Sequence, residues 1–517
     1  MLRRMDQTDP SMDFSAASKS ERSLLDWRSM AAFGLPFTLY LLTLAPTIYN
    51  LDSAELTTAA ATGGLVRVTG YPLYLILGYA WAQIPIGDVG YRMNLFSAFS
   101  GALTIALVER ILRRWRVGPW ATFGALGLLA CAPFFWALSL IAEVYTLHTL
   151  LMATIILLLL RWSDQPTPGR LATVGLALGL SFGHHAATAL LIPGCAWYVL
   201  SRAPRQALAP RSLLLSTGAF LAGLSVYLYL PLRYAATPAF NYAGYYDASG
   251  AFVLTDLRTP QGLWWLVSGR SFAGQMLAYH GADLWREAGR FGAQLWQAFF
   301  VLGVGPGLLG VALLLKRDWR LGGMLLCMFA CNAAFYIDYR VVDKNTMFLP
   351  AYLVWALWLG LGYEQLLDWT RRARGAVTQT RGSILLQAAM AGGVLLALAW
   401  NWRLVDLSDD WSARSRGETI LSQAEPQALI LGWWDTVPVI EYLQLVEGQR
   451  PDVQAINRFL IAREDMARLI EREMAHRPVY VDSPSADVLK TADAKSAGPI
   501  YRLQPRELSA IRPDGLP

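Results

Sequence analysis

Long apolar runs that carry no charge are the feature that most constrains this chain. Four of them are Ala121–Ala142, Thr146–Leu160, Ser212–Leu232 and Gly322–Ile337. Each approaches the roughly 20 residues that a helix needs to cross the hydrocarbon core of a bilayer. Charged residues make up only 16% of the chain, against about a quarter in soluble domains. The runs therefore predict an all-α polytopic membrane protein.

Clusters of basic residues between these runs predict its orientation. Lys and Arg are enriched in the cytoplasmic loops of membrane proteins. If the clusters at 110–116, 202–211 and 316–320 lie on the cytoplasmic side, successive spans cross the membrane in alternating directions and the N-terminus lies in the cytoplasm. Topology thus explains the net charge of +6, and no nucleic acid is expected as a partner. The path gives about 11 transmembrane helices, at about 29–45, 92–111, 119–138, 146–161, 170–184, 186–200, 212–231, 293–315, 321–338, 347–367 and 383–402.

The membrane part of the chain is expected to carry large outer loops. Residues 1–28 form a polar cytoplasmic tail, and residues 29–402 form the transmembrane body. Two outer loops of this body are long, at 46–91 and 233–292. Within the first, Tyr71–Ile84 is apolar but too short to span, so we expect a helix along the outer interface.

The last part of the chain, residues 403–517, has the composition of a soluble domain. Ala428–Gly432 and Pro478–Asp482 are predicted as short strands. Glu464–His476 is predicted as an amphipathic helix, because its apolar residues recur at helical spacing. These elements predict a small α/β extracytoplasmic C-terminal domain.

Acidic residues on the outer side are the first candidates for chemistry. Asp52 and Glu55 follow the first span, and a spacing of three places both on one face of a helix. Their local sequence also fits a capping box, with Asp52 as N-cap. Glu143 is a lone acid between two apolar spans, where it either faces a wet cavity or ends a span at the surface. Asp338 and Asp343 flank another outer loop.

Outer cations and histidines are the second group of candidates. His184 and His185 lie at the tip of a pair of short spans, where they serve either chemistry or a helical turn. Arg233 ends a span, where it binds phosphate or extends to lipid headgroups. Arg67 and Arg92 are expected on the outer side, whereas basic residues of membrane proteins are enriched on the cytoplasmic side. This exception favours a role in binding an anionic group.

Several blocks of sequence share a pattern with a known family. The most specific is APTIYNLDSAEL at 45–56, followed by GYPLY at 70–74 and YRMNLFSA at 91–98. Shorter blocks are AEVY at 142–145, GLSFGHH at 179–185, YLPLR at 229–233 and RPDV at 450–453. Together they resemble the protein O-mannosyltransferase-like family, bacterial relatives of the endoplasmic-reticulum transmembrane O-mannosyltransferase. That family belongs to the GT-C glycosyltransferases, so the resemblance implies a GT-C-like body.

The resemblance also implies roles for individual residues. Asp52 would be the general base or the carboxylate that orients the acceptor, with Glu55 as its partner and Glu143 as a second acid. A carboxylate can accept a proton as a hydroxyl attacks the anomeric carbon. Tyr71 and Tyr145, which stand in matching blocks, would lie at the substrate.

One block departs from the family pattern. Where the family commonly has His-Pro-Pro before Gly-Tyr-Pro, this chain has Arg67-Val68-Thr69. Arg67 could therefore contact the donor phosphate in place of the histidine. A phosphodiester leaving group needs cationic stabilisation, which Arg233 could also supply. The remaining residues expected to bind substrate are Arg92, His184 and His185.

The expected function is transfer of a sugar, mannose by resemblance, from a polyprenyl-phosphate carrier to a protein Ser/Thr hydroxyl at the outer membrane face. The expected location is a bacterial inner (plasma) membrane. The acceptor could instead be a lipid or an envelope glycan, and a transporter or flippase of a lipid-linked sugar is an alternative of another class. The chain has no nucleotide-binding or zinc-protease motif. No cofactor is required and no metal site is expected, although acids around a phosphate could hold a divalent cation.

Overall fold

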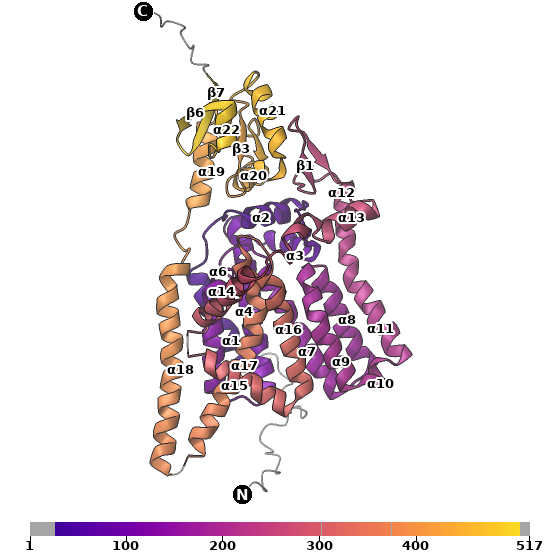
Figure 1. The fold of residues 1–517 in the computed structure, drawn as a ribbon, viewed down its shortest axis with the longest axis vertical. Helices are drawn as coiled ribbons and strands as arrows, with labels where there is room; N and C mark the ends of the chain where they lie inside the picture. The colour runs from indigo at the N-terminus through magenta and orange to yellow at the C-terminus, as the bar shows by residue number, and fades with distance from the viewer. Residues whose placement is uncertain (1–25, 301, 374, 507–517) are drawn as a thin grey trace, which may run out of the picture.

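The computed structural model describes residues 26–300, 302–373 and 375–506. Long helices form a bundle, and a small α/β domain stands at one end of it (Figure 1). The expected cytoplasmic tail lies almost entirely outside the described residues. The helices up to the middle of the chain are α1 (Trp27–Leu42), α2 (Asp52–Thr62), α3 (Pro72–Ala82), α4 (Val89–Arg114), α5 (Pro119–Ala130), α6 (Pro133–Ala137), α7 (Tyr145–Asp164), α8 (Pro168–Phe182), η3 (Ala186–Leu191), α9 (Ile192–Arg202), α10 (Pro204–Ala207), α11 (Pro210–Leu224), η4 (Ser225–Leu228) and α12 (Tyr229–Ala235).

The second half of the body is also helical and follows an irregular loop. That loop holds a short hairpin of β1 (Gly244–Tyr246) and β2 (Phe252–Leu254). The helices that follow are α13 (Pro260–Val267), η5 (Arg270–Gln275), α14 (Ala282–Ala298), α15 (Val304–Arg317), α16 (Trp319–Ile337), η6 (Lys344–Phe348), α17 (Leu349–Arg371) and α18 (Ala376–Val405).

Helices occur at each of the eleven ranges expected to span the membrane. By length and composition, six helical segments of the described chain could cross a membrane: Val89–Arg114, Tyr145–Asp164, Pro210–Ala235, Trp319–Ile337, Lys344–Arg371 and Val377–Val405. The membrane class is therefore confirmed.

The expected span at 293–315 is not one helix. It covers the end of α14, a break and most of α15. Phe300, within the break, has a left-handed backbone with φ 48°, which a right-handed helix does not accommodate. The break therefore divides the expected span into two shorter helices.

Helix α17 forms the centre of the bundle, since nearly every residue from Leu349 to Leu367 is buried. Glycines allow its neighbour α15 to approach closely. A Cβ added at Gly310 would lie 1.8 Å from the carbonyl oxygen of Trp358, and one at Gly362 would lie 1.8 Å from that of Pro306. Small residues at such crossings let two backbones come into contact, which is how helices pack tightly in membranes.

The C-terminal part folds as the sequence predicts, into a small α/β unit. Its helices and strands are α19 (Ser412–Gln423), β3 (Leu429–Gly432), α20 (Val437–Leu445), β4 (Gln454–Asn457), η7 (Arg458–Leu460), α21 (Arg463–Met474), β5 (Val479–Val481), α22 (Ala486–Thr491), β6 (Ala492–Ala497) and β7 (Ile500–Pro505). The sheet order is β4-β3-β5-β7-β6, with β3 parallel to both of its neighbours. Strands β3 and β5 and helix α21 confirm the three expected elements.

This domain rests on the helices of the first outer loop. In Figure 1, α2 and α3 lie between the bundle and the domain, with α20 directly above α2. The backbone N–H of Gly90 donates to the hydroxyl of Tyr442 at 3.3 Å, and Arg414 pairs with Asp88 at 3.3 Å. Helix α3 corresponds to the short apolar helix expected at Tyr71–Ile84. The first outer loop is therefore enclosed between body and domain.

Candidate functional site

Helix α2 places its two acids differently from a capping box. Leu51, not Asp52, is the N-cap, with a left-handed φ of 56° and no side-chain capping bond. Asp52 is therefore the first residue of the helix and Glu55 the fourth. Because neither carboxylate caps the helix, both are free to bind other groups. The structure thus decides against the capping interpretation.

Arg67 joins the two acids. Its Nη2 donates to Oδ1 of Asp52 at 2.5 Å, and its Nε donates to Oε2 of Glu55 at 3.3 Å. The backbone N–H of Arg67 also donates to Oε1 of Glu55, at 2.8 Å. Glu55 therefore holds Arg67 by both side chain and backbone. Nη1 of Arg67 donates to none of the described residues and is left for another acceptor.

Burial controls the charge of this cluster. Glu55 is only 2% exposed, and burial raises its pKa to about 7, although the charge of Arg67 opposes the rise. Burial alone would lower the pKa of Arg67, but the carboxylates of Asp52 and Glu55 raise it above its usual range. Arg67 therefore stays charged, while Glu55 exchanges its proton near neutral pH.

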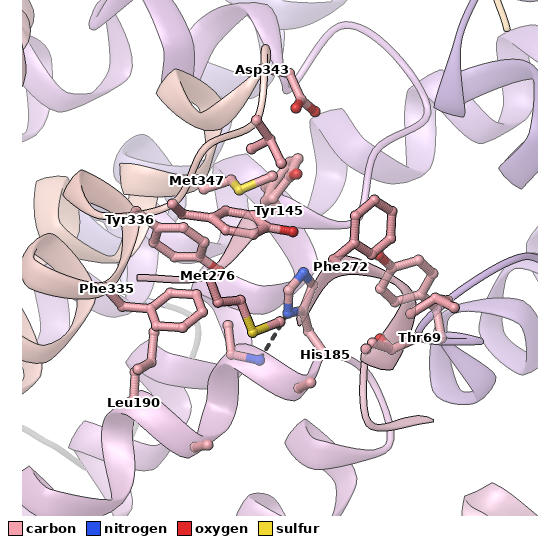
Figure 2. A pocket seen from close by; sticks show the side chains of 18 of the residues that line it. Thr69, Tyr145, His185, Leu190, Phe272, Met276, Phe335, Tyr336, Asp343 and Met347 are labelled. Atoms are coloured by element: carbon pink, nitrogen blue, oxygen red, sulfur yellow. Dashed lines mark hydrogen bonds between the residues drawn. The ribbon is translucent and has the colours of Figure 1, made fainter. Parts of the chain in front are cut away.

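A cavity of about 230 Å³ opens beside this cluster. Asp52 and Arg67 line it, and so do residues from distant parts of the body. Tyr71 and Tyr145 line it from the ends of α3 and α7, and His185 lines it from the turn before η3. Figure 2 shows the His185 ring among the side chains of Tyr145, Phe272 and Met276. Four of the seven residues predicted to bind substrate, Arg67, Tyr71, Tyr145 and His185, therefore meet at one cavity.

The two adjacent histidines have different surroundings. His185 accepts a hydrogen bond at Nδ1 from the backbone N–H of Ala187, at 3.0 Å. Its proton therefore belongs on Nε2. His184 is buried, and its Nε2 lies 2.8 Å from the carbonyl oxygen of Val144. His184 thus supports the cavity wall from behind rather than lining it.

The third predicted acid lies close to the same charges. Glu143 follows α6 and is half-buried, and its backbone N–H donates to the hydroxyl of Ser97 at 3.1 Å. Burial raises the pKa of Glu143, and the negative charges of Asp52 and Asp343 raise it further. Asp343 itself lines the cavity. Three outer acids are therefore near enough to influence one another.

Two arginines predicted to bind substrate lie elsewhere. Arg92 donates to the carbonyl oxygens of Ala82, Ile86 and Gly87 at 2.6, 3.0 and 3.0 Å. Arg233 donates through Nε to the carbonyl oxygen of Gly63 at 2.5 Å, at the C-terminal end of α2. Neither residue lines the cavity. Both arginines bind backbone carbonyl groups instead of facing the cavity. Their positions in the sequence do not indicate this structural role.

Trp434 is the contact that sequence reasoning missed. It lies in the C-terminal domain, yet its indole Nε1 donates to Oδ1 of Asp52 at 2.9 Å. Its ring lies 4.1 Å from Cζ of Arg67. Only its occurrence as one of two adjacent tryptophans directly after an expected strand marked it in the sequence.

The site residues do not form a metal centre of familiar composition. Among the residues that the structure describes, no group of three or more His, Cys, Asp or Glu side chains is arranged to hold a metal ion. Two acids of α2, Asp52 and Glu55, are instead both paired with one cation, Arg67.

Comparison with known proteins finds relatives of similar sequence. Residues 52–208 match the family model described as the N-terminal domain of the protein O-mannosyl-transferase TMEM260. Protein O-mannosyl-transferase TMEM260 of Mus musculus is 25% identical over 456 residues, 84% of this chain and 63% of the relative. The protein O-mannosyl-transferase tmem260 of Dictyostelium discoideum is 21% identical over 476 residues, 82% of this chain and 56% of the relative. The chain thus spans about three-fifths of the length of these relatives.

Solved structures share the fold over nearly the whole chain. ArnT from Cupriavidus metallidurans bound to undecaprenyl phosphate matches with a TM-score of 0.60 and 12% identity, over 92% of this chain and 97% of ArnT. The apo state of the same protein matches with a TM-score of 0.58 and 13% identity, over 92% of this chain and 96% of ArnT. The expected resemblance is therefore confirmed: this is an integral membrane protein of O-mannosyltransferase-like sequence and GT-C-like fold.

Proposed function

We propose that this protein is a membrane glycosyltransferase that moves a sugar, mannose, from a polyprenyl-phosphate carrier to a Ser or Thr hydroxyl of a protein. The names of its relatives support the sugar and the acceptor. The undecaprenyl phosphate bound to ArnT supports the lipid carrier. Transfer takes place at the extracytoplasmic face of a bacterial inner membrane, with the N-terminus in the cytoplasm.

One observation carries the proposal. Asp52 and Arg67, an acid and a cation in direct contact, line one cavity within the helical body. A carboxylate can take the proton of an attacking hydroxyl. A guanidinium can bind the phosphate that leaves, since its planar fork matches phosphate oxygens. Both chemical requirements of the transfer are therefore met within a few ångströms.

The proposed reaction uses two oxygens of Asp52 for two purposes. Oδ1 already accepts from Arg67 and Trp434, whereas Oδ2 accepts no hydrogen bond from the described residues. As the acceptor oxygen bonds to the anomeric carbon, its proton passes to Oδ2. The bond from that carbon to the phosphate oxygen breaks, and its electron pair stays on the lipid phosphate. Attack opposite the leaving group inverts the anomeric configuration.

Arg67 supports the leaving group in this scheme. Its Nη1 donates no hydrogen bond to the described residues, and its Nε and Nη2 are fixed by the two acids. Nη1 can therefore donate to the phosphate while the rest of the guanidinium stays in place. Donors fixed before the reaction stabilise developing charge most effectively.

We also propose that the transfer needs no resident metal ion, because Arg67 supplies the charge that the phosphate requires. A chelator added to the transfer assay should leave the rate unchanged. A rate that falls with chelator and returns with Mg²⁺ or Mn²⁺ would contradict this part of the proposal.

The test is transfer by the purified protein in detergent. Labelled polyprenyl-phosphate-mannose is supplied with a pool of envelope proteins and lipids, and the labelled product identifies the acceptor. The variant Asp52→Asn keeps the shape of the side chain and removes its basicity, so we expect the rate to fall about a hundredfold or more.

A matched control is Asp256→Asn, which alters another outer aspartate paired with an arginine, Arg258, away from the cavity. This variant should retain the wild-type rate. Transfer that survives Asp52→Asn would contradict the mechanism. Label recovered in a lipid or a glycan would show that the acceptor is not a protein. Absence of transfer by the wild type would overturn the proposed function.

A further inference from the structure

The loop after strand β3 extends from the C-terminal domain to the membrane body. It holds Trp433 and Trp434 between β3 and α20. Because β3 is parallel to both neighbouring strands, this loop lies at the carboxyl edge of the sheet, where α/β domains commonly place functional groups. The loop thus brings a residue of the domain to Asp52, which is 382 positions away in the sequence.

Trp434 makes two different contacts with the acidic cluster. Its Nε1 donates to Oδ1 of Asp52 at 2.9 Å, and the face of its ring lies 4.1 Å from Cζ of Arg67. A cation over an indole ring is attracted by the electron density of the ring face. One side chain therefore holds both the acid and the cation.

The position of Trp434 is itself fixed by aromatic neighbours. Tyr242, from the second outer loop, and Phe459, from the C-terminal domain, each contact its ring edge to face at 5.5 Å. Tyr242 in turn donates to the carboxylate of Glu441 on α20. With only 9% of its surface exposed, Trp434 is not free to move away from Asp52.

Because of these contacts, one carboxylate oxygen of Asp52 accepts hydrogen bonds and the other accepts none from the described residues. Arg67 and Trp434 both donate to Oδ1, while the side chain as a whole remains 34% exposed. A carboxylate anchored in this way presents its second oxygen in a fixed direction. Fixed orientation of a catalytic group accounts for a substantial part of the rate of an enzyme.

We propose that Trp434 is a positioning residue, and that the docked C-terminal domain completes the transfer site by orienting Asp52 and Arg67. This inference rests on the proposed function and assigns a catalytic purpose to the domain. Trp434 does not touch the reacting atoms, and it acts through the two residues that do. The domain therefore contributes to the rate of transfer even when both substrates are bound.

The test compares two conservative variants of adjacent tryptophans in the full-length protein. Trp434→Phe removes the N–H donor and keeps an aromatic ring, of smaller size, for Arg67 and Tyr242. Trp433→Phe is the matched control, since the ring of Trp433 contacts Arg458 at 4.7 Å, whereas the contacts with Asp52 and Arg67 belong to Trp434. Both proteins are assayed at saturating and limiting concentrations of polyprenyl-phosphate-mannose, and their melting temperatures are measured.

We expect Trp434→Phe to lower kcat about tenfold, since it removes a hydrogen bond to a charged group, with KM unchanged and only a small fall in melting temperature from the smaller ring. Trp433→Phe should match the wild type. Unchanged kcat in Trp434→Phe beside an active wild type would overturn the role of Trp434 and leave the proposed function intact. A lower melting temperature with unchanged kcat would assign Trp434 to domain packing alone and would also overturn the proposal. An inactive wild type would instead overturn the proposed function.

Discussion

The two ends of helix α2 each meet an arginine from another part of the chain, and they use it differently. At the N-terminal end, Arg67 pairs with the side chains of Asp52 and Glu55 beside a cavity. At the C-terminal end, Arg233 donates to the backbone carbonyl of Gly63. A Cβ added at Gly63 would lie 2.9 Å from Nη2 of Arg233, so that end is closely packed.

This difference separates the proposed transfer site from a contact that only stabilises the fold. The carbonyls at the end of a helix lack partners and carry partial negative charge, so a cation there stabilises the helix. A cation between two carboxylates instead leaves charge and hydrogen-bonding capacity facing the cavity. The same residue type is thus expected to serve catalysis at one end of α2 and folding at the other.

Removal of Arg67 tests this contrast most strongly. Arg67→Met keeps an unbranched apolar stem, removes the guanidinium and leaves Glu55 buried without its cation, and we expect a loss of transfer of about a hundredfold. Arg67→Lys keeps the charge but not the planar fork, so an intermediate loss of about tenfold is expected. The rate per folded molecule, measured after size-exclusion chromatography in detergent, checks both. A rate within twofold of the wild type would remove Arg67 from the site.

Glu55 gives the comparison a pH dependence. Because burial raises the pKa of Glu55 to about 7, a fall from pH 8 to pH 6 adds a proton and weakens its hold on Arg67. The wild-type rate should therefore fall over this range. Glu55→Gln should be about tenfold slower at pH 8 and show less change with pH, as measured by initial rates in one mixed buffer.

The raised pKa of Glu55 also predicts that the stability of the protein changes with pH in the opposite direction to the rate. A carboxyl whose pKa is raised on folding binds more protons in the folded state, so its contribution to stability is lost as pH rises through about 7. The wild-type melting temperature should fall from pH 5 to pH 8 more steeply than that of Glu55→Gln. Burial also raises the pKa of Glu441 to about 8, and the charge of Glu55 contributes to this rise. Glu441→Gln is therefore the control that measures how much Glu441 contributes to the change of melting temperature with pH. Equal slopes in wild type and Glu55→Gln would contradict the assignment.

Arg233 should show the reverse of Arg67. Arg233→Met removes the charged donor from the end of α2, and we expect a loss of stability of about 2 kcal/mol, typical of hydrogen bonds from a charged group. The rate per folded molecule should stay within about threefold of the wild type. A large loss of rate without loss of melting temperature would make Arg233 a substrate ligand after all.

Arg92 is expected to have the smallest effect. It holds the turn after α3 through three backbone carbonyls. Arg92→Met should lower stability by about 1 kcal/mol, increase protease cleavage at residues 83–87 and leave the rate of transfer unchanged. Limited proteolysis beside the transfer assay measures both effects. An unchanged cleavage pattern with a reduced rate would contradict the structural role.

Residue type and local spacing predicted part of the site. Asp52, Glu55 and Arg67 all belong to one segment of about 16 residues, and their charges alone marked them as unusual beside a membrane. The structure then brings Tyr71, Tyr145 and His185 to the same cavity. Arg92 and Arg233 carry the same charge as Arg67, and nothing in their local sequence distinguishes a ligand for phosphate from a ligand for backbone carbonyls.

The sequence by itself determined the membrane class, most of the helices, the C-terminal α/β domain and the acidic motif, because apolar length, helical spacing and charge are local properties. The tertiary structure alone decided which cation meets which partner, and that Leu51 rather than Asp52 caps α2. It alone brought Trp434 to Asp52 across 382 positions. The free energy of such a contact depends on burial and on distance in space, and neither is set until the distant segments have packed together.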